Sequence, residues 1–165
     1  MKHLNNVGVI KLTSDFLSGS KSSSMEEMQK IRQKIEGLLP SWDVLIIDGA
    51  GTDKKSLLQY YNGNVELLHW DSNILLNLLS NILRDIVNKI EVRGLVLIGG
   101  DTAFRICEDL GVYGIHILKE IEPYVPAGIL MGGKLDGVPV VTKAGGFGSQ
   151  NILISAMKFF GIGSL

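Results

Sequence analysis

The sequence has 165 residues, of which 45% are hydrophobic and 20% charged, and a chain of this size can bury the core of one domain. Its 16 basic and 17 acidic residues give a net charge of −1, so charge provides no case for binding nucleic acid or an anionic membrane. A single cysteine excludes a disulfide framework, and neither a signal peptide nor a membrane span is recognisable. We therefore expect a cytoplasmic protein without nucleic-acid or membrane partners.

The first half of the chain alternates short apolar runs with segments whose apolar residues recur three and four apart. The former are typical of buried strands and the latter of helices that pack on a sheet. The predicted elements, in order, are a strand at 7–12, a helix at 25–39, a strand at 43–48 and a helix from residue 71 or 72 to about 90. A glycine turn follows the second strand at 49–53. Residues 54–71 lack a clear pattern, and 65–69 fit a short strand or a loop equally well.

The second half opens with a strand, a glycine turn and a helix. Leu95–Ile98 is an uninterrupted apolar run, which predicts a strand buried on both faces. The first glycine turn, Gly99–Thr102, follows it, and its residues Asp101 and Thr102 are good N-caps for a helix over 103–110.

A second unit of the same design lies near the C-terminus. A strand at 138–142 leads into the second glycine turn, Lys143–Gly148, and a helix is predicted over 149–160. The segments between the two units are predicted as a strand at 115–118, a proline-bounded loop at 119–128, a strand at 128–131 and a hairpin connection at 132–137.

This order of elements predicts an α/β fold. Strands that alternate with helices form right-handed crossovers and a mostly parallel sheet, here in three layers with helices on both faces. The two strands near the C-terminus have no helix between them and predict an antiparallel edge. We find no linker, and therefore expect a single domain over residues 1–165.

The first glycine turn is a candidate phosphate site. A strand, two glycines and a helix N-terminus bring free N–H groups and the positive end of a helix dipole to one place. Gly99 and Gly100 allow a close approach to the backbone, Thr102 could donate a hydrogen bond to a phosphate, and Asp101 could contact a hydrated Mg²⁺ or a sugar hydroxyl. The alternative is that one of the two polar residues is only the N-cap.

The second glycine turn has three glycines within four residues. Gly145 and Gly146 would let the backbone approach a bulky anion, and Lys143 could add a positive charge. The alternative is a tight strand-to-helix turn with a solvated lysine. We expect the two turns to lie side by side, because both follow strands of one sheet, and to hold one phosphate chain together.

Other chemistries find little support in the sequence. No P-loop motif is present, and a dinucleotide fingerprint that includes Gly146 would need a glycine where Asn151 stands. The three histidines lack ligand spacing, so we predict no metal site formed by the protein alone. Cys107 is expected in the core, and Glu120 and Glu122 either line the mouth of the site or lie in a solvated loop. No catalytic residue can be assigned.

Three motifs together resemble a known family. They are Gly-Gly-Asp-Thr-Ala at 99–103, Glu-Ile-Glu-Pro-Tyr-Val-Pro at 120–126 and Thr-Lys-Ala-Gly-Gly-Phe-Gly at 142–148. Their order is similar to that of the C-terminal nucleotide-binding domain of four-carbon acid sugar kinases, which phosphorylate threonate, erythronate and 3-oxo-tetronate with ATP. The resemblance implies that Gly99–Thr102 belong to an ATP-contacting turn, and that Gly145 and Gly146 belong to a second, phosphate-side turn.

The chain departs from the family pattern in three respects. No Gly-Ser-x-Ser turn is found near Met1, and Tyr124 stands where the family usually has glycine. The family's N-terminal sugar-binding domain, which by resemblance supplies the acceptor site and the catalytic base, has no counterpart in these residues.

The resemblance implies the ATP-binding half of a kinase. Such a chain would hold ATP and Mg²⁺ for phosphoryl transfer to a hydroxyl bound by a separate domain or partner chain, and would be inactive alone. Exposed apolar surface where that domain would dock could also make the chain self-associate. A non-catalytic nucleotide- or phosphate-binding regulatory module is the alternative, and a small-molecule enzyme of flavodoxin-like or Rossmann-like fold is a third reading.

Overall fold

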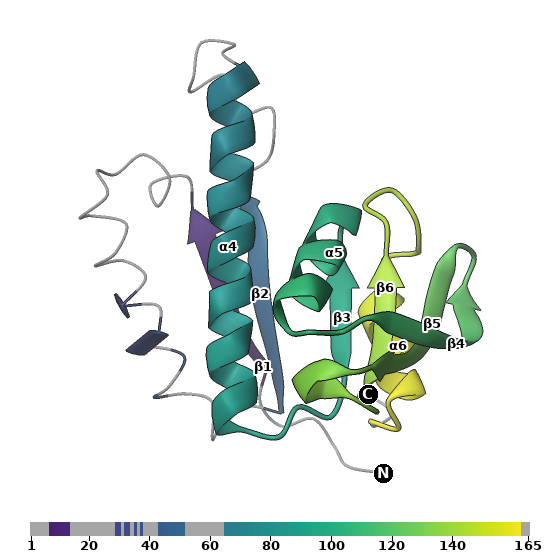
Figure 1. Ribbon diagram of the computed structural model, residues 1–165. Helices are drawn as coiled ribbons and strands as arrows, with labels where there is room; N and C mark the ends of the chain where they lie inside the picture. Colours follow the sequence, from purple (N-terminus) through teal and green to yellow (C-terminus); the bar gives the residue numbers. More distant parts are fainter. Residues whose placement is uncertain are drawn as a thin grey trace. The chain divides into compact units, whose positions relative to one another are not determined.

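The computed structural model describes residues 7–13, 29–30, 32–33, 35, 37, 43–51 and 65–162 (Figure 1). Contacts divide the chain into two compact units, one built on Leu4–Leu78 and the other mainly on Leu79–Leu165. The prediction of a single domain over residues 1–165 stays a prediction. Within the predicted helix 25–39, the described residues are helical, and the other residues of that helix lie outside the described part of the chain.

In the unit Leu4–Leu78, two strands form a parallel pair: β1 is Val7–Thr13 and β2 is Val44–Gly51. Both predicted strands are thus confirmed. The glycine turn predicted at 49–53 is wrong for residues 49–51, which continue β2; residues 52 and 53 lie outside the described residues. The reason is that the ladder resumes after an irregularity in β1 and pairs Thr13 with Gly51, so its hydrogen bonds outweigh the weak strand propensity of glycine.

Helix α4 covers Val65–Lys89 and is longer than predicted. The sequence predicts a short strand or a loop at 65–69 and a helix that begins at residue 71 or 72; both expectations are wrong, because 65–69 are the first residues of α4. Leu67 and Trp70 extend the apolar spacing of Ile74 and Leu78 backward by two turns, and this spacing outweighs the polar residues that suggested an N-cap. Among the described residues, no helix combines the length and apolarity needed to cross a membrane.

The unit Leu79–Leu165 contains a four-stranded sheet in the order β3-β6-β5-β4. The strands are β3 Leu95–Ile98, β4 Gly114–Glu122, β5 Val125–Met131 and β6 Pro139–Lys143. The pair β3–β6 is parallel, whereas β5 is antiparallel to both β4 and β6. The α/β class and the antiparallel strands near the C-terminus are therefore confirmed. In place of one mostly parallel sheet, the described residues form a parallel two-stranded sheet and a mixed four-stranded sheet with one parallel and two antiparallel pairs.

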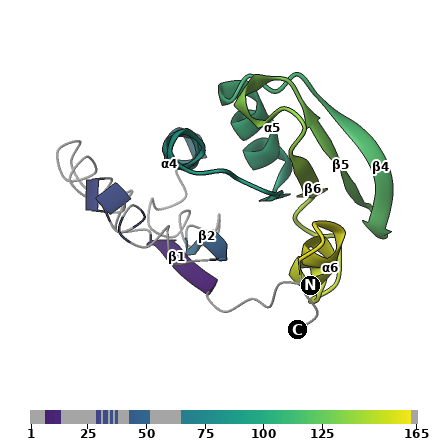
Figure 2. The same ribbon diagram turned by 90° about the horizontal axis from the view of Figure 1, so that it is seen from below.

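Helices α5, Gly100–Asp109, and α6, Ile152–Phe159, cover opposite faces of this sheet (Figures 1 and 2). The cluster on the α5 face consists of Leu83, Leu97, Ile106, Leu110, Leu130, Leu135 and Val140. The cluster on the α6 face consists of Val125, Ala127, Val141, Ile152 and Ala156. Successive side chains of a strand point to opposite faces of the sheet, so Val140 belongs to one cluster and Val141 to the other. Both faces are therefore apolar, and each is covered by a helix.

Two details of this core concern sequence expectations. Cys107 packs against the α5-face cluster as expected, and burial raises the pKa of its thiol. The prediction that Leu95–Ile98 is buried on both faces is wrong at its last residue, because Leu97 is 3% exposed but Ile98 is 47% exposed. Ile98 is the last residue of β3 and directly precedes the first glycine turn.

The loop predicted at 119–128 is wrong: these residues form the outer half of a β4–β5 hairpin. Its two-residue turn is Pro123-Tyr124, and Tyr124 has φ 62°. Proline fixes its own φ near the value that the first central position of a type II turn needs, and the second position of that turn requires positive φ. The prolines that suggested a loop therefore mark the hairpin turn and an interior β5 position, where Pro126 pairs with Glu120.

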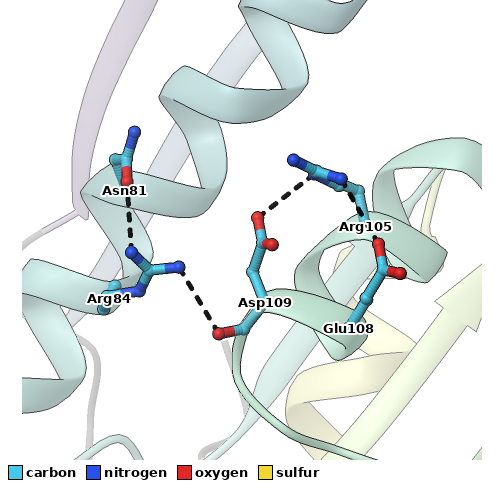
Figure 3. A network of polar contacts seen from close by, with 5 residues as sticks. All are labelled: Asn81, Arg84, Arg105, Glu108 and Asp109. Atoms are coloured by element: carbon cyan, nitrogen blue, oxygen red, sulfur yellow. Dashed lines mark hydrogen bonds and ion pairs between the residues drawn. The ribbon is translucent and has the colours of Figure 1, made fainter.

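The C-terminal end of α5 is tied to the second half of α4 (Figure 3). Arg84 of α4 donates to the carbonyl oxygen of Asp109 at 3.5 Å and to the side chain of Asn81 at 3.4 Å. Arg105 forms ion pairs with Glu108 and Asp109 at 3.3 and 3.2 Å. Guanidinium groups near a helix C-terminus complement its partial negative charge, so these contacts hold α5 at the end opposite the first glycine turn.

Candidate phosphate-binding site

The two glycine turns lie side by side, as the sequence predicts. Strands β3 and β6 are paired in parallel with Ile98 opposite Lys143, so both chains leave the sheet at the same edge. The amide of Gly99 then donates to the carbonyl oxygen of Lys143 at 2.8 Å. The carboxyl ends of adjacent parallel strands are where α/β folds bind ligands.

In the first glycine turn, Gly99 is the N-cap of α5, with φ 102° and ψ 130°, and no side chain caps the helix. The prediction that Asp101 or Thr102 is the N-cap is therefore wrong, and both residues lie in the first turn of the helix. The positive φ needed to leave β3 explains this, since only glycine adopts it without strain. A β-carbon at Gly99 would also lie 3.3 Å from Oγ1 of Thr102.

The N-terminus of α5 keeps open donors. The first bond of the helix runs from the amide of Ala103 to the carbonyl oxygen of Gly99, so the amides of Gly100, Asp101 and Thr102 precede the helical ladder. Within the described part of the chain, none of these three amides has a recorded hydrogen-bond acceptor. Three converging N–H groups at the positive end of a helix form an anion-binding arrangement.

In the second glycine turn, the lysine side chain folds onto its own turn. Nζ of Lys143 donates to the carbonyl oxygens of Gly145 and Ala144 at 2.7 and 3.2 Å. The amide of Phe147 donates to the carbonyl oxygen of Ala144 at 3.2 Å. The ammonium group of Lys143 is thus bonded to two carbonyl oxygens of the turn that follows it.

The centre of the second turn is open, whereas its end is tightly packed. A β-carbon added at Gly145 or Gly146 would meet no heavy atom within 4 Å, and neither residue has positive φ. At Gly148, which has φ 83°, a β-carbon would lie 3.3 Å from side-chain atoms of Lys143 and Val125. The fold therefore requires glycine at 148 but not at 145 or 146.

Glu122, the last residue of β4, binds Ser149, the residue that follows the second glycine turn. Its Oε2 accepts a hydrogen bond from the amide of Ser149 at 2.6 Å, and its Oε1 accepts from the hydroxyls of Ser155 and Ser149 at 2.8 and 3.1 Å. The bond from the Ser149 amide, followed by that from the Ser155 hydroxyl, lowers the pKa of Glu122. Glu122 thus holds the segment that leads into α6, whose first turn carries no acidic residue, whereas the first turn of α5 carries Asp101.

The structure brings all seven predicted residues to this sheet edge. The sequence placed Glu120 and Glu122 either at the mouth of the site or in a solvated loop; both belong to strand β4, and each has a hydrogen-bond partner. Glu120 accepts a hydrogen bond from the amide of Tyr124, and Glu122 binds Ser149 and Ser155. The sequence signal for Glu122 was weak: the first turn of α6 carries no acidic residue, so a carboxylate from another element would be favourable near that end of the helix.

Metal ligands are sparse. Across the described residues, no group of three or more His, Cys, Asp or Glu side chains is arranged to hold a metal ion. Asp101 is the acidic residue of the first turn of α5. One carboxylate suits Mg²⁺ that is held mainly by phosphate oxygens and water, and does not suit a metal held by the protein alone.

Comparison with known proteins gives this fold and site a class. Residues 1–153 match the family described as "Nucleotide-binding C-terminal domain". The chain belongs to this family, as the C-terminal domain found in four-carbon acid sugar kinases.

Curated relatives point to the same enzymes. The chain is 39% identical over 75 residues to D-threonate kinase of Salmonella typhimurium, 48% over 65 residues to that of Bordetella bronchiseptica, and 30% over 69 residues to D-erythronate kinase of Heliobacterium modesticaldum. These matches cover 46%, 39% and 42% of this chain but only 18%, 16% and 16% of the relatives. The chain therefore matches less than a fifth of the length of each of these kinases.

Solved structures agree with the fold. A domain of unknown function from Bordetella bronchiseptica, crystallised with citrate as a domain-swapped dimer, is 27% identical with a TM-score of 0.67, over 93% of this chain and 35% of that one. A Haemophilus influenzae protein has a TM-score of 0.64 at 19% identity, over 94% of this chain and 35% of that one, and shows the fold alone.

Proposed function

We propose that this chain is the ATP-binding part of a kinase that phosphorylates four-carbon sugar acids of the threonate, erythronate or 3-oxo-tetronate type. One observation carries the proposal: two glycine turns share a sheet edge, with open amides at Gly100–Thr102 and open backbone at Gly145 and Gly146. A helix N-terminus beside an unobstructed glycine turn suits a chain of phosphates. The threonate and erythronate kinases among its relatives supply the substrate class.

Each residue of the site would have its own role in binding the nucleotide. The amides of Gly100, Asp101 and Thr102 would bind phosphate oxygens, with the hydroxyl of Thr102 as a further donor. Gly145 and Gly146 would let the second turn approach the other side of the phosphate chain, and Lys143 would hold that turn in shape and add positive charge. The carboxylate of Asp101 would hold hydrated Mg²⁺ against the phosphates.

Phosphoryl transfer depends mainly on position and charge stabilisation, so these residues could do a large part of the work without a base. Mg²⁺ would neutralise charge on the phosphate oxygens. The acceptor hydroxyl and the base that takes its proton would come from a sugar-binding domain or partner chain, and a cytoplasmic setting would supply ATP. The chain alone would bind nucleotide and transfer nothing.

A thermal-shift experiment tests nucleotide binding. The chain is melted with ATP, ADP and AMP, each with and without Mg²⁺. A ligand at one hundred times its Kd adds about 2.7 kcal/mol to the free energy of unfolding, which raises the melting temperature measurably. We expect the largest shift with ATP and Mg²⁺. Equal melting temperatures in all six conditions and in buffer would overturn the proposal.

A non-catalytic nucleotide- or phosphate-binding module is the second candidate. It is favoured by the side chain of Lys143, which bonds to its own turn instead of extending from it. The two candidates differ in activity: adding the sugar-binding domain of a threonate kinase should restore phosphoryl transfer from ATP only if the chain is the kinase half. Binding without transfer in that mixture would favour the regulatory module.

A further inference from the structure

The tip of the β4–β5 hairpin, Glu122–Tyr124, contacts the second glycine turn at two separate places. Glu122 binds the amide and hydroxyl of Ser149, directly after the turn, together with the hydroxyl of Ser155 in α6. The ring of Tyr124 packs on that of Phe147 within the turn, with ring centroids 5.0 Å apart and planes tilted by 44°. Neither residue is part of the proposed phosphate contacts.

These contacts leave the middle of the turn untouched. The beginning of the turn is held by the bond from the amide of Gly99 to the carbonyl oxygen of Lys143, and its end by Glu122 and by the packing of Gly148 on Val125. Between these anchors, Gly145 and Gly146 have no neighbour where a side chain would point. A glycine-rich segment without anchors would lose much conformational entropy on binding a ligand. Anchors at both ends reduce that loss before the ligand arrives.

The strain at Tyr124 is consistent with a dedicated contact. A tyrosine at φ 62° is unfavourable by about 1 kcal/mol or more, since only glycine and a few polar residues adopt this region readily. The side chain is 69% exposed, so burial in the core does not compensate for the strain. Its ring contacts that of Phe147 in the second turn.

We infer that the hairpin tip is a positioning element for the nucleotide site: Glu122, assisted by Tyr124, presets the second glycine turn so that Gly145 and Gly146 meet the phosphate chain in a formed turn. The inference rests on the proposed nucleotide binding. It adds residues that touch no ligand and act through Ser149 and Phe147. It also gives a role to the carboxylate of Glu122, which accepts a hydrogen bond from the Ser149 amide before the start of α6.

The test uses the full chain and four proteins: wild type, Glu122→Ala, Glu122→Gln and the control Glu108→Ala. Glu108 is an exposed glutamate that pairs with Arg105, and it lies at the end of α5 opposite the first glycine turn. Calorimetry measures the Kd of ATP with Mg²⁺ and of AMP, and hydrogen exchange measures the amides of residues 144–148 without ligand.

We expect Glu122→Ala to weaken ATP binding about tenfold, which corresponds to loss of one charged hydrogen bond, and to weaken AMP binding less because AMP has fewer phosphates for the turn. Exchange at 144–148 should become faster in this variant. Glu122→Gln should restore most of the affinity, because its carbonyl oxygen can accept from the Ser149 amide while its NH₂ group donates to the serine hydroxyls. Glu108→Ala should match wild type.

The outcomes separate the two proposals. If wild type does not bind ATP, the proposed function fails, and the inference fails with it. If wild type binds ATP but Glu122→Ala binds it within about twofold, the function stands and the positioning role is overturned. An equal loss for ATP and AMP without faster exchange also overturns it. If Glu122→Ala does not fold, Ser155→Ala replaces it; this variant removes one contact of Glu122 and should weaken ATP binding about threefold.

Discussion

The amide of Gly99 donates to the carbonyl oxygen of Lys143 at 2.8 Å, so the two glycine turns begin at a common hydrogen bond. The bond continues the β3–β6 ladder by one step beyond its last register pair, Ile98 and Lys143. The sheet register therefore sets the relative position of the turns. A ligand bound by the open amides after Gly99 lies next to the glycines that follow Lys143.

The first prediction concerns the open centre of the second turn. Gly146→Val should leave the free energy of unfolding within about 0.5 kcal/mol of wild type, because a β-carbon at this position would meet no heavy atom within 4 Å. The same side chain would stand where a phosphate has to approach, so the increase in melting temperature with ATP and Mg²⁺ should disappear. Thermal melts with and without ligand measure both effects.

Gly37→Val is the matched control, because Gly37 also has open space around it and lies outside both turns. Valine is a better helix former than glycine by a few tenths of a kcal/mol, so the stability of this variant should be equal to or slightly above that of wild type, and its ATP response should persist. A folded Gly146→Val that responds to ATP as wild type does would show that the turn does not contact the nucleotide. A variant that fails to fold would show that Gly146 is needed for structure.

The second prediction compares two glycines of one turn. Gly148→Ala should reduce the free energy of unfolding by about 1–3 kcal/mol, since it combines positive φ with close contact to Val125. Gly145→Ala should change it by less than about 0.5 kcal/mol, because the position is open and has no positive φ. Urea unfolding of both variants gives the comparison. Equal losses would contradict the division of the turn into an open centre and a packed end.

The fold was predictable where the local sequence pattern favours the same element that the packed structure contains. Leu95–Ile98 and the antiparallel strands near the C-terminus were found because apolar runs and glycine turns specify them locally. The β4–β5 hairpin was missed because Pro123 and Pro126 are loop signals unless the partner strand is known. Pairing of Glu120 with Pro126 is a tertiary fact that the sequence does not display.

The site was predictable to the level of the turns but not of their contacts. Both glycine turns follow strands, and their adjacency follows from parallel pairing. The contacts of the side chains were not predictable. Lys143 bonds to a carbonyl oxygen of its own turn, and Glu122 bonds to Ser149, which is 27 residues away in the sequence. Long-range hydrogen bonds of this kind have no periodic signal, so only the missing acidic residue at the start of α6 hinted at them.

The third prediction concerns the strained tyrosine. Tyr124→Ala keeps the positive φ and loses the ring contact with Phe147, so it should reduce stability by about 0.5–1.5 kcal/mol. Tyr124→Gly loses the same contact but relieves about 1 kcal/mol of strain, so its stability should be near that of wild type. Urea unfolding should therefore rank Tyr124→Gly above Tyr124→Ala.

A double-mutant cycle with Phe147→Ala isolates the ring contact. The coupling energy between Tyr124→Ala and Phe147→Ala should equal most of the loss seen in the single variants, because the two rings contact each other and are otherwise exposed. Strictly additive effects would mean that the rings do not stabilise each other. If Tyr124→Gly is less stable than Tyr124→Ala, the strain at this position is not the deciding cost.

The last prediction is a pH dependence of stability. Hydrogen bonds from the Ser149 amide, the Ser155 hydroxyl and the Ser149 hydroxyl lower the pKa of Glu122 below its ordinary value of 4.5 in spite of an opposing desolvation effect. In the unfolded chain Glu122 binds its proton at the higher, ordinary pKa, so the ionised carboxylate favours the folded state. This contribution is complete above about pH 4.5 and is lost as the pH falls through the lower pKa of the folded state.

Comparison of variants isolates this contribution from that of the other carboxylates. Glu122→Gln does not titrate, so between pH 6 and about 3 its free energy of unfolding should fall less steeply than that of wild type. Ser155→Ala removes one cause of the lowered pKa, so its curve should lie between the two. Urea unfolding across this range measures the three curves. Parallel curves for wild type and Glu122→Gln would mean that the carboxylate is not held by Ser149 and Ser155 in solution, and a steeper fall for Ser155→Ala than for wild type would contradict the assigned cause.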